Sequence, residues 1–447
     1  MSIAATAAQR LDLAAISAAV RQLPWVEQWQ ITQRDLSRQE RYLTFLAVES
    51  ERESAATTWT VWTATAAVDG KQGEASFTVQ AGDSPQVLAG CLERAQAAAQ
   101  AAWNPAFTLP GAGEVGVAPA WGAEPGALAD PAISADAPGA VDALAREFAQ
   151  AVAACPWVRP STLEIFVTTH DRILLNHRGL RLRERRTHAF AEFVLLHRAP
   201  GRDEVEFYAQ TEAASLQALS LAARVARAAR CVRDGAVAVP TAPGVQAVVI
   251  GDEYLAKLVD SFRHHADASR HASRTNVFAL DEPVIRRKSG APLTVVSDPS
   301  VTSLAAYQFD EQGYAPTRTT LIESDRLVGV VGSARWMHVL GRRPRGSAGT
   351  LVIPAGDAPL EELLPGTLEV VAFSDLAARY DTGAFSGEIR LAYRHHADGR
   401  VEAVSGGSVS GVLTQALADC RFSREVTTCA GYHGPRAARF TALTVAG

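Results

Sequence analysis

Residues Ala247 to His271 have the sequence AVVIGDEYLAKLVDSFRHHADASRH, which predicts a strand followed by a helix. A short apolar run, Ala247 to Ile250, predicts a strand that turns at Gly251 and Asp252 into a helix. Four apolar residues then recur at helical spacing and predict one buried face of that helix: Leu255, Leu258, Val259 and Phe262.

The predicted helix ends in a group of histidines. His264, His265 and His271 are three of the 11 histidines in the chain, which suggests a metal or catalytic site. The alternative is that they are solvent-exposed side chains in a last helical turn, where the helix dipole favours them. Zinc helices normally place their ligands as H-E-x-x-H, and that pattern is absent here. The histidines alone do not decide between a metal or catalytic site and solvent-exposed side chains.

Composition excludes several classes of protein. A net charge of −5 argues against a general nucleic-acid binder, which would carry a basic excess. Five scattered cysteines without a C-x-x-C pair argue against a disulfide scaffold and fit a reducing compartment. The N-terminal residues predict an amphipathic helix and not a signal peptide, and no apolar run approaches the roughly 20 residues that span a bilayer. We therefore expect a cytoplasmic protein without a membrane segment.

The length of 447 residues and two changes in composition divide the chain. Residues 108–140 are rich in Pro, Gly and Ala without periodicity, which predicts a linker or long surface loop. PTAPG, at residues 240–244, marks a second break. We therefore predict an α+β protein with an N-terminal α/β domain of antiparallel strands and flanking helices (1–240), followed by a β-rich domain (241–447).

The N-terminal domain shows the same pattern on both sides of the predicted linker: a helix, several antiparallel strands and a second helix, which suggests an internal duplication. In the first copy, three strand-like runs are predicted at Trp25 to Arg34, Tyr42 to Ser50 and Thr57 to Val68. In the second copy, arginines recur at helical spacing along the last helix: Arg224, Arg227, Arg230 and Arg233. This basic stripe predicts either a solvated face or a contact with an acidic partner.

No standard catalytic motif is present. The glycine-rich segment SGGSVSG at residues 405–411 lacks the Gly-Lys-Ser/Thr of a P-loop and the G-x-S-x-G of a serine hydrolase. It predicts a turn that needs positive φ. From the residues alone, no catalytic group and no metal ligand is assigned to this chain.

An ordered set of segments resembles the TldD/TldE (PmbA) family of zinc metallopeptidase subunits. Most of the resembling segments lie in the C-terminal half: SDPS (297–300), FDEQGYAPTRTTLIE (309–323), PAGDAPLEELL (354–364), DTGAFSGEIR (381–390), SGGSVSG and the closing LTVAG. GLRLRERRTHAF and the helix after SPQVLAG extend the likeness into the N-terminal half. The resemblance implies the α+β fold with a β-rich C-terminal domain that is typical of this family.

TldD-type members carry H-E-x-x-x-H on a helix after a short strand, and the two His and a distant Cys bind zinc. Aligned at Gly251, that pattern places the first His at Asp260, the Glu at Ser261 and the second His at His265. The Cys falls near Cys429, in TTCAGYHG. A zinc hydrolase needs a carboxylate to accept the proton of the bound water, and Ser261 has none. The resemblance is therefore to the TldE/PmbA-type subunit, which lacks the motif.

This resemblance implies a non-catalytic subunit without a cofactor of its own. It would form a heterodimer with a TldD-like, H-E-x-x-x-H-bearing subunit that holds the zinc and cleaves small or unfolded peptides, with peptide natural-product maturation as one setting. Two alternatives stay open. One is a stand-alone metallohydrolase with Asp260, His265 and Cys429 as an altered metal site, since all three residue types bind zinc. The other is a peptide-binding scaffold without an enzyme partner.

Overall fold

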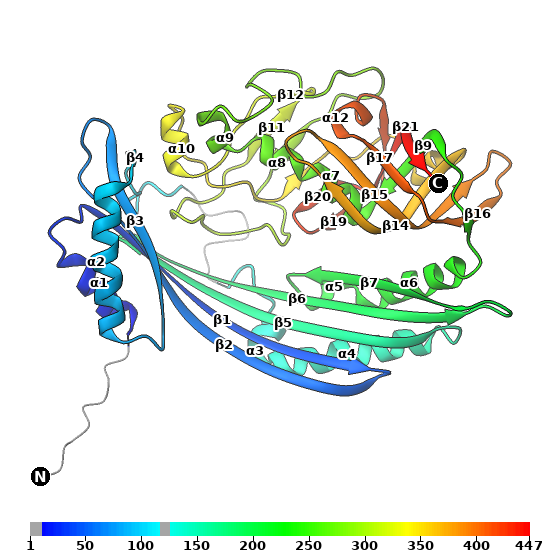
Figure 1. Cartoon of the computed structure of the whole chain (residues 1–447), viewed down its shortest axis with the longest axis horizontal. Helices are drawn as coiled ribbons and strands as arrows, with labels where there is room; N and C mark the ends of the chain where they lie inside the picture. Colours follow the sequence, from blue (N-terminus) through cyan, green and yellow to red (C-terminus); the bar gives the residue numbers. More distant parts are fainter. Residues whose placement is uncertain (1–10, 117–125) are drawn as a thin grey trace, which may run out of the picture.

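The structure is a computed structural model that describes residues 11–116 and 126–447. Part of the predicted N-terminal helix and the middle of the predicted linker lie outside these residues. The protein is strand-rich and mixed α+β, as the sequence predicts. A long curved sheet lies along one side, and the C-terminal half packs over one of its faces (Figure 1). Within the described residues, no helix is long and apolar enough to cross a membrane.

The long sheet is antiparallel and seven-stranded. Its order is β4 (Trp103–Pro105), β3 (Lys71–Gln80), β2 (Ala47–Ala64), β1 (Gln28–Thr44), β5 (Arg159–Asn176), β6 (Arg181–Arg198) and β7 (Glu204–Ala213). Helices α1 (Leu13–Arg21) and α2 (Pro85–Ala101) pack on β1–β3, while α4 (Ala137–Ala153) and α6 (Leu221–Gly235) pack on β5–β7. Two short helices complete this half, α3 (Pro131–Ala135) and α5 (Leu216–Leu219).

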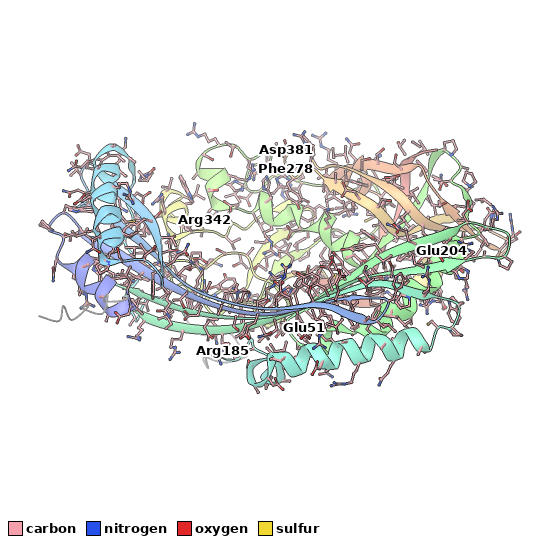
Figure 2. The ribbon with its side chains drawn as sticks, turned by 60° about the horizontal axis from the view of Figure 1, so that its bottom comes forward. Glu51, Arg185, Glu204, Phe278, Arg342 and Asp381 are labelled. Atoms are coloured by element: carbon pink, nitrogen blue, oxygen red, sulfur yellow. The ribbon has the colours of Figure 1, made fainter. Side chains whose placement is uncertain are left out.

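The two faces of the sheet have different partners. Alternate side chains of a strand point to opposite faces. Odd-numbered residues of β5, such as Ile165 and Val167, pack against α4, whereas Arg172 and Leu174 contact the C-terminal half. Figure 2 shows Arg185, an odd-numbered residue of β6, on the side of the sheet that carries α4. The even-numbered side chains of β5 and β6 thus line the space between the two halves.

The sheet has an internal two-fold repeat. The order helix, three antiparallel strands, helix occurs once before and once after the residues that join β4 to α3. Pro24-Trp25-Val26 and Pro156-Trp157-Val158 follow α1 and α4 at an offset of 132 residues (156 minus 24). Helices α1 and α4 end at the same offset, at Arg21 and Ala153. The predicted duplication is therefore present in both the topology and a short sequence match.

Two predictions for this half are wrong. The run Tyr42 to Ser50 is not one strand: it contains the turn between β1 and β2, in which Phe45 and Leu46 adopt φ of 49° and 67°. Neither residue is a usual turn residue, so a turn could not be predicted there from residue types. The predicted linker is also too long. Its last residues form α3 and the first turn of α4, with Asp130 and Asp136 as N-caps.

The C-terminal half contains a closed barrel and a second sheet. The barrel runs β14 (Thr367–Ala378), β9 (Gly244–Gly251), β21 (Ala437–Ala446), β17 (Ser408–Val412) and β15 (Ala384–His395), which pairs again with β14. Three strands extend it, β16 (Val401–Ser405), β8 (Val239–Pro240) and β18 (Cys420–Phe422). The second sheet runs β12 (Arg326–Leu327), β11 (Thr319–Glu323), β10 (Val295–Ser297), β13 (Leu351–Val352), β20 (Tyr432–Pro435) and β19 (Val426–Cys429).

The stretch from Ala247 to His271 lies at the centre of this half. Strand β9 is followed by α7 (Asp252–Val259), α8 (Ser261–His265) and α9 (Ala268–Ala272). The predicted apolar face of α7 and α8 is buried against both the barrel and the second sheet, with Leu255, Leu258, Val259 and Phe262 at most 1% exposed. Gly251 is required here because an added Cβ would lie 2.9 Å from the carbonyl oxygen of Arg436. Short helices α10 (Ala334–Val339), α11 (Leu360–Leu363) and α12 (Leu413–Ala416) lie at the periphery.

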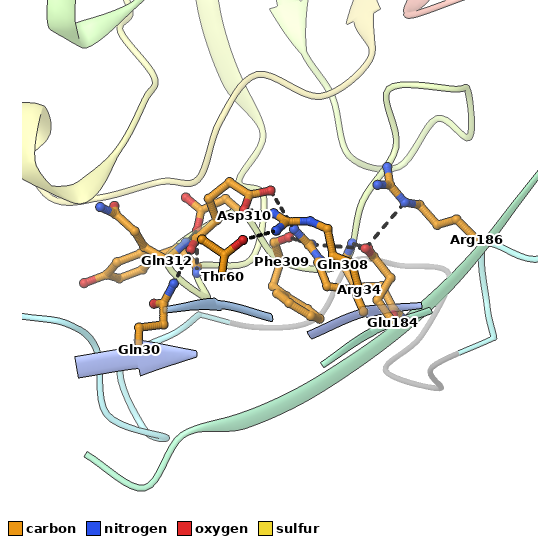
Figure 3. Close-up of polar contacts among 12 residues, drawn as sticks. Gln30, Arg34, Thr60, Glu184, Arg186, Gln308, Phe309, Asp310 and Gln312 are labelled. Carbon is orange, nitrogen blue, oxygen red and sulfur yellow. Dashed lines mark hydrogen bonds and ion pairs between the residues drawn. The ribbon is translucent and has the colours of Figure 1, made fainter. Parts of the chain in front are cut away.

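A buried ion pair binds the loop at residues 308–311 of the C-terminal half to the long sheet. Arg172 of β5 and Glu184 of β6 are 3.0 Å apart, and their side chains are 9% and 1% exposed. Glu184 also accepts the backbone N–H of Gln308, and Arg172 donates to the carbonyl of Phe309 and lies 4.2 Å over its ring. Glu311 pairs with Arg172 and with Arg34 of β1. Figure 3 shows Arg34 and Glu184 beside residues 308–310 of this loop. The loop thus contacts three strands.

We predict that Glu184→Gln destabilises the protein by about 3 kcal/mol, because the buried Arg172 loses its buried counter-charge. Glu53→Gln, an exposed position on β2, is the matched control and should change little. Urea unfolding of both variants measures the difference. Equal midpoints for the two variants would contradict the role of the ion pair.

The same loop contains a carboxyl group with a perturbed pKa. Burial raises the pKa of Asp310 to about 6, against the opposing effect of the backbone N–H groups of Gln312 and Tyr314, which both donate to its Oδ1. Below about pH 4 the folded and unfolded states both hold the proton. Above pH 6 the folded state must carry a buried charge, so the raised pKa lowers stability as pH rises through this window.

We therefore expect the stability of the wild type, relative to Asp310→Asn, to fall by about 3 kcal/mol between pH 4 and pH 7.5. The asparagine keeps an oxygen that accepts the two N–H groups, so the comparison isolates the charge. Urea unfolding of both proteins across this range provides the test. A difference that does not depend on pH would show that Asp310 titrates normally.

Candidate functional site

The positions predicted to match a zinc-binding helix do not come together. Asp260 is the residue between α7 and α8, and its side chain is 44% exposed. Ser261 and His265 are buried in α8, at 4% and 3% exposure. Cys429 ends β19 and is half-buried. Within residues 11–116 and 126–447, no three His, Cys, Asp or Glu residues are grouped so as to hold a metal ion.

His265 is part of a hydrogen-bonded cluster on the side of the helix that packs against residues 276–278. Its Nδ1 lies 2.9 Å from Oδ1 of Asn276, and its ring packs edge-on against Phe278. The carbonyl of His265 accepts from Asn276 and lies 2.8 Å from Nε2 of His271. Burial is the main cause that lowers the pKa of His265. These contacts within the chain give both His265 and His271 a structural role.

Asp260 has a cation beside it from its own helix. Nε of Arg263 donates to Oδ1 of Asp260 at 2.9 Å, and Nη1 donates to the carbonyls of Ala348 and Gly349 at 2.6 and 2.8 Å. Nη2 lies against Gly431, where an added Cβ would be only 3.0 Å away. The Arg263 guanidinium therefore occupies the space between Asp260 and the turn that follows Cys429.

Cys429 is not poised to be a thiolate. Burial, with the nearby carboxylates of Glu253 and Asp252, raises the pKa of its thiol to about 12. A metal ligand or nucleophile needs the deprotonated form. At neutral pH the Cys429 side chain is therefore a protonated, half-buried thiol.

The basic stripe of α6 is largely satisfied inside the chain. Arg224 pairs with Glu253, and Arg227 pairs with Asp252, each at 2.5 Å. Arg233 lies over Trp157, and Arg230 is exposed. Both readings of the stripe are thus wrong for Arg224 and Arg227, since these arginines attach α6 to the first turn of α7.

A cavity of about 480 Å³ lies between the long sheet and the C-terminal half. The sheet contributes His170, Arg186, His188 and Glu212, and the C-terminal half contributes Asp260, Arg263, the loop 302–306 and the turn 430–431. His188 and Glu212 are 3.0 Å apart. Of the predicted site residues, Asp260 alone lines this cavity.

The four cavity residues of the sheet were not predicted from the sequence, although the pairing of strands across a turn indicates that three of them lie together. The hairpin of β5 and β6 turns around Arg178 and Gly179, which places His170 opposite Arg186 and Thr168 opposite His188. His170, Arg186 and His188 therefore share one face. The pairing across this turn is the signal from which their proximity could have been predicted.

Residues 243–447 match the sequence profile of the family described as the PmbA/TldA metallopeptidase C-terminal domain. The C-terminal half belongs to this family. The resemblance to TldD/TldE (PmbA) proteins is thereby confirmed. A relative named metalloprotease, from Methanothermobacter thermautotrophicus, is 24% identical over 129 residues, and the match spans only 27% of each chain.

Solved structures share the fold of this protein over nearly the whole chain. TldE from Thermococcus kodakarensis superimposes with a TM-score of 0.77 at 19% identity, covering 97% of this chain and 100% of that one. A protein from Thermotoga maritima, described as a candidate modulator of a DNA gyrase, gives a TM-score of 0.78 at 16% identity, covering 97% and 99%. At these identities the likeness establishes the fold.

We predict that Arg263→Met lowers the free energy of unfolding by about 2–3 kcal/mol, because it removes charge-assisted hydrogen bonds to Asp260 and to two backbone carbonyls. Lys257→Met, on the exposed side of α7, is the matched control. Chemical denaturation of both variants gives the comparison. A loss no larger than that of the control would show that Arg263 does not hold these segments together.

Proposed function

We propose that this chain is the non-catalytic, TldE/PmbA-like subunit of a two-chain zinc peptidase that cleaves small or unfolded peptides in the cytoplasm. The zinc belongs to a TldD-like partner that carries H-E-x-x-x-H. This chain forms part of the wall of the space in which the peptide is held. Maturation of a peptide natural product is one process that needs such an enzyme.

One observation supports the proposal: the guanidinium of Arg263 lies between Asp260 and the turn after Cys429. A zinc ion shared between this helix and the turn after Cys429 would lie next to the guanidinium, and the two positive charges would repel each other. The carboxylate of Asp260 is already neutralised by Arg263 at 2.9 Å. Ser261 supplies no general base, and His265 is held by Asn276.

The membership of residues 243–447 in a metallopeptidase family supports a role in peptide hydrolysis. A chain of this family without a general base of its own can contribute to hydrolysis through a second subunit. Two observations stand against an altered metal site of Asp260, His265 and Cys429: His265 is hydrogen-bonded to Asn276, and burial raises the pKa of the Cys429 thiol.

Co-expression with the H-E-x-x-x-H-bearing homologue of the same genome tests the proposal. We expect the two chains to co-purify, to hold zinc, and to hydrolyse an unfolded peptide only together. His265→Ala and Cys429→Ser in this chain should leave the zinc content unchanged. Substitution of the first motif histidine in the partner should remove the zinc.

Two results would contradict the proposal. Stoichiometric zinc in this chain alone, lost in His265→Ala, would establish the altered metal site. Failure to co-purify, or full peptidase activity of the homologue without this chain, would favour the peptide-binding scaffold.

A further inference from the structure

The cavity between the two halves has one polar wall and one largely apolar wall. The polar wall is the face of β5–β7 that carries His170, Arg186, His188 and Glu212. The opposite wall includes Asp260, Arg263, Thr302 and Ser303, but most of its residues are small or apolar: Leu304, Ala305, Ala306, Ala430 and Gly431. A volume of about 480 Å³ falls in the range of small-ligand pockets, roughly 300–1,000 Å³.

Arg186 has weak contacts within the protein. Its Nη1 lies 3.4 Å from the carbonyl oxygen of Ala306, and its Nε lies 3.5 Å from Glu184. Glu184 is already the closer partner of Arg172, at 3.0 Å. A guanidinium has five N–H donors in a planar fork, so Arg186 retains most of its capacity to bind a carboxylate. Figure 3 shows it extending from β6 toward a loop of the C-terminal half.

The carboxylates that line the cavity do not neutralise Arg186. Glu212 is paired with His188 at 3.0 Å, and Asp260 is paired with Arg263 at 2.9 Å. His170 is directly opposite Arg186 in the strand register. Burial, followed by the positive charges of Arg186, His188 and Arg38, lowers the pKa of His170. Two arginines, Arg186 and Arg38, therefore place positive charge close to His170.

We propose that Arg186 and His170 bind the carboxylate of a peptide whose small or apolar side chains contact the opposite wall. The carboxylate is either the C-terminus of the peptide or an acidic side chain. That the ligand is a peptide rests on the proposed function, whereas the recognition of a carboxylate rests on Arg186 itself. The binding site lies within this chain and requires no residue of a partner.

Isothermal titration calorimetry on the full chain tests this inference. The probes are acetyl-tetraalanine with a free C-terminus, the same peptide as its C-terminal amide, and an amide in which one alanine is replaced by aspartate. We expect the free acid to bind roughly ten- to a hundredfold more tightly than the plain amide, the range for a charge-assisted hydrogen bond. Tight binding of the aspartate-containing amide would identify a side chain as an equivalent source of the carboxylate.

Variants assign the effect to Arg186. Arg186→Gln should bind the free acid and the amide equally weakly, and Arg186→Lys should recover part of the preference. Arg183→Gln is the matched control, since Arg183 is exposed on the same strand but points to the opposite face. It should behave as the wild type.

Three results would overturn the inference: no binding of any probe at millimolar concentration, equal binding of acid and amide by the wild type, or an unchanged preference in Arg186→Gln. Each is independent of the co-expression experiment. A chain that prefers the acid through Arg186 but never co-purifies with a metallopeptidase subunit would retain the site and lose the proposed function. Co-purification with a metallopeptidase subunit, without a preference for the acid, would support the proposed function and contradict the carboxylate site.

Discussion

The buried pair of Arg172 and Glu184 is the interaction on which the arrangement of the two halves depends. It joins two strands of the long sheet and at the same time receives the backbone of residues 308 and 309 from the C-terminal half. A buried ion pair contributes little net stability, but the loss of one member is costly. Its main effect here is positional: it holds residues 308 and 309 against β5 and β6, close to the cavity residue Arg186.

The sequence predicted the elements that have strong local signals. The helix after Gly251 shows an apolar period of 3.6, and its four marked residues are buried as expected. The glycine turn at residues 405–411 was also predicted, and Gly406 and Gly407 have positive φ. The hairpin at Phe45 and Leu46 was not, because long-range pairing with β5 and not turn chemistry decides where that turn forms.

The candidate site was less accessible to sequence reasoning, for a physical reason. The family pattern directed attention to Asp260, Ser261 and His265, which are close in sequence but face different surroundings in the fold. The cavity residues come from β5, β6 and β7 and from three separate segments of the C-terminal half, residues 260–263, 302–306 and 430–431. Their proximity follows from strand register and from the docking of one half on the other. Strand register can be inferred from the position of a turn in the sequence, whereas the docking of the two halves cannot.

The internal repeat makes the backbone of the long sheet symmetric, but the side chains at equivalent positions of the two copies differ. At the offset of 132 residues, the counterparts of His170, Arg186, His188 and Glu212 are Arg38, Ser54, Ala56 and Gln80. One copy thus carries two imidazoles and a carboxylate that the other copy lacks. The side chains of the sheet that line the cavity therefore come from the second copy of the repeat, although both copies supply the same pattern of strands.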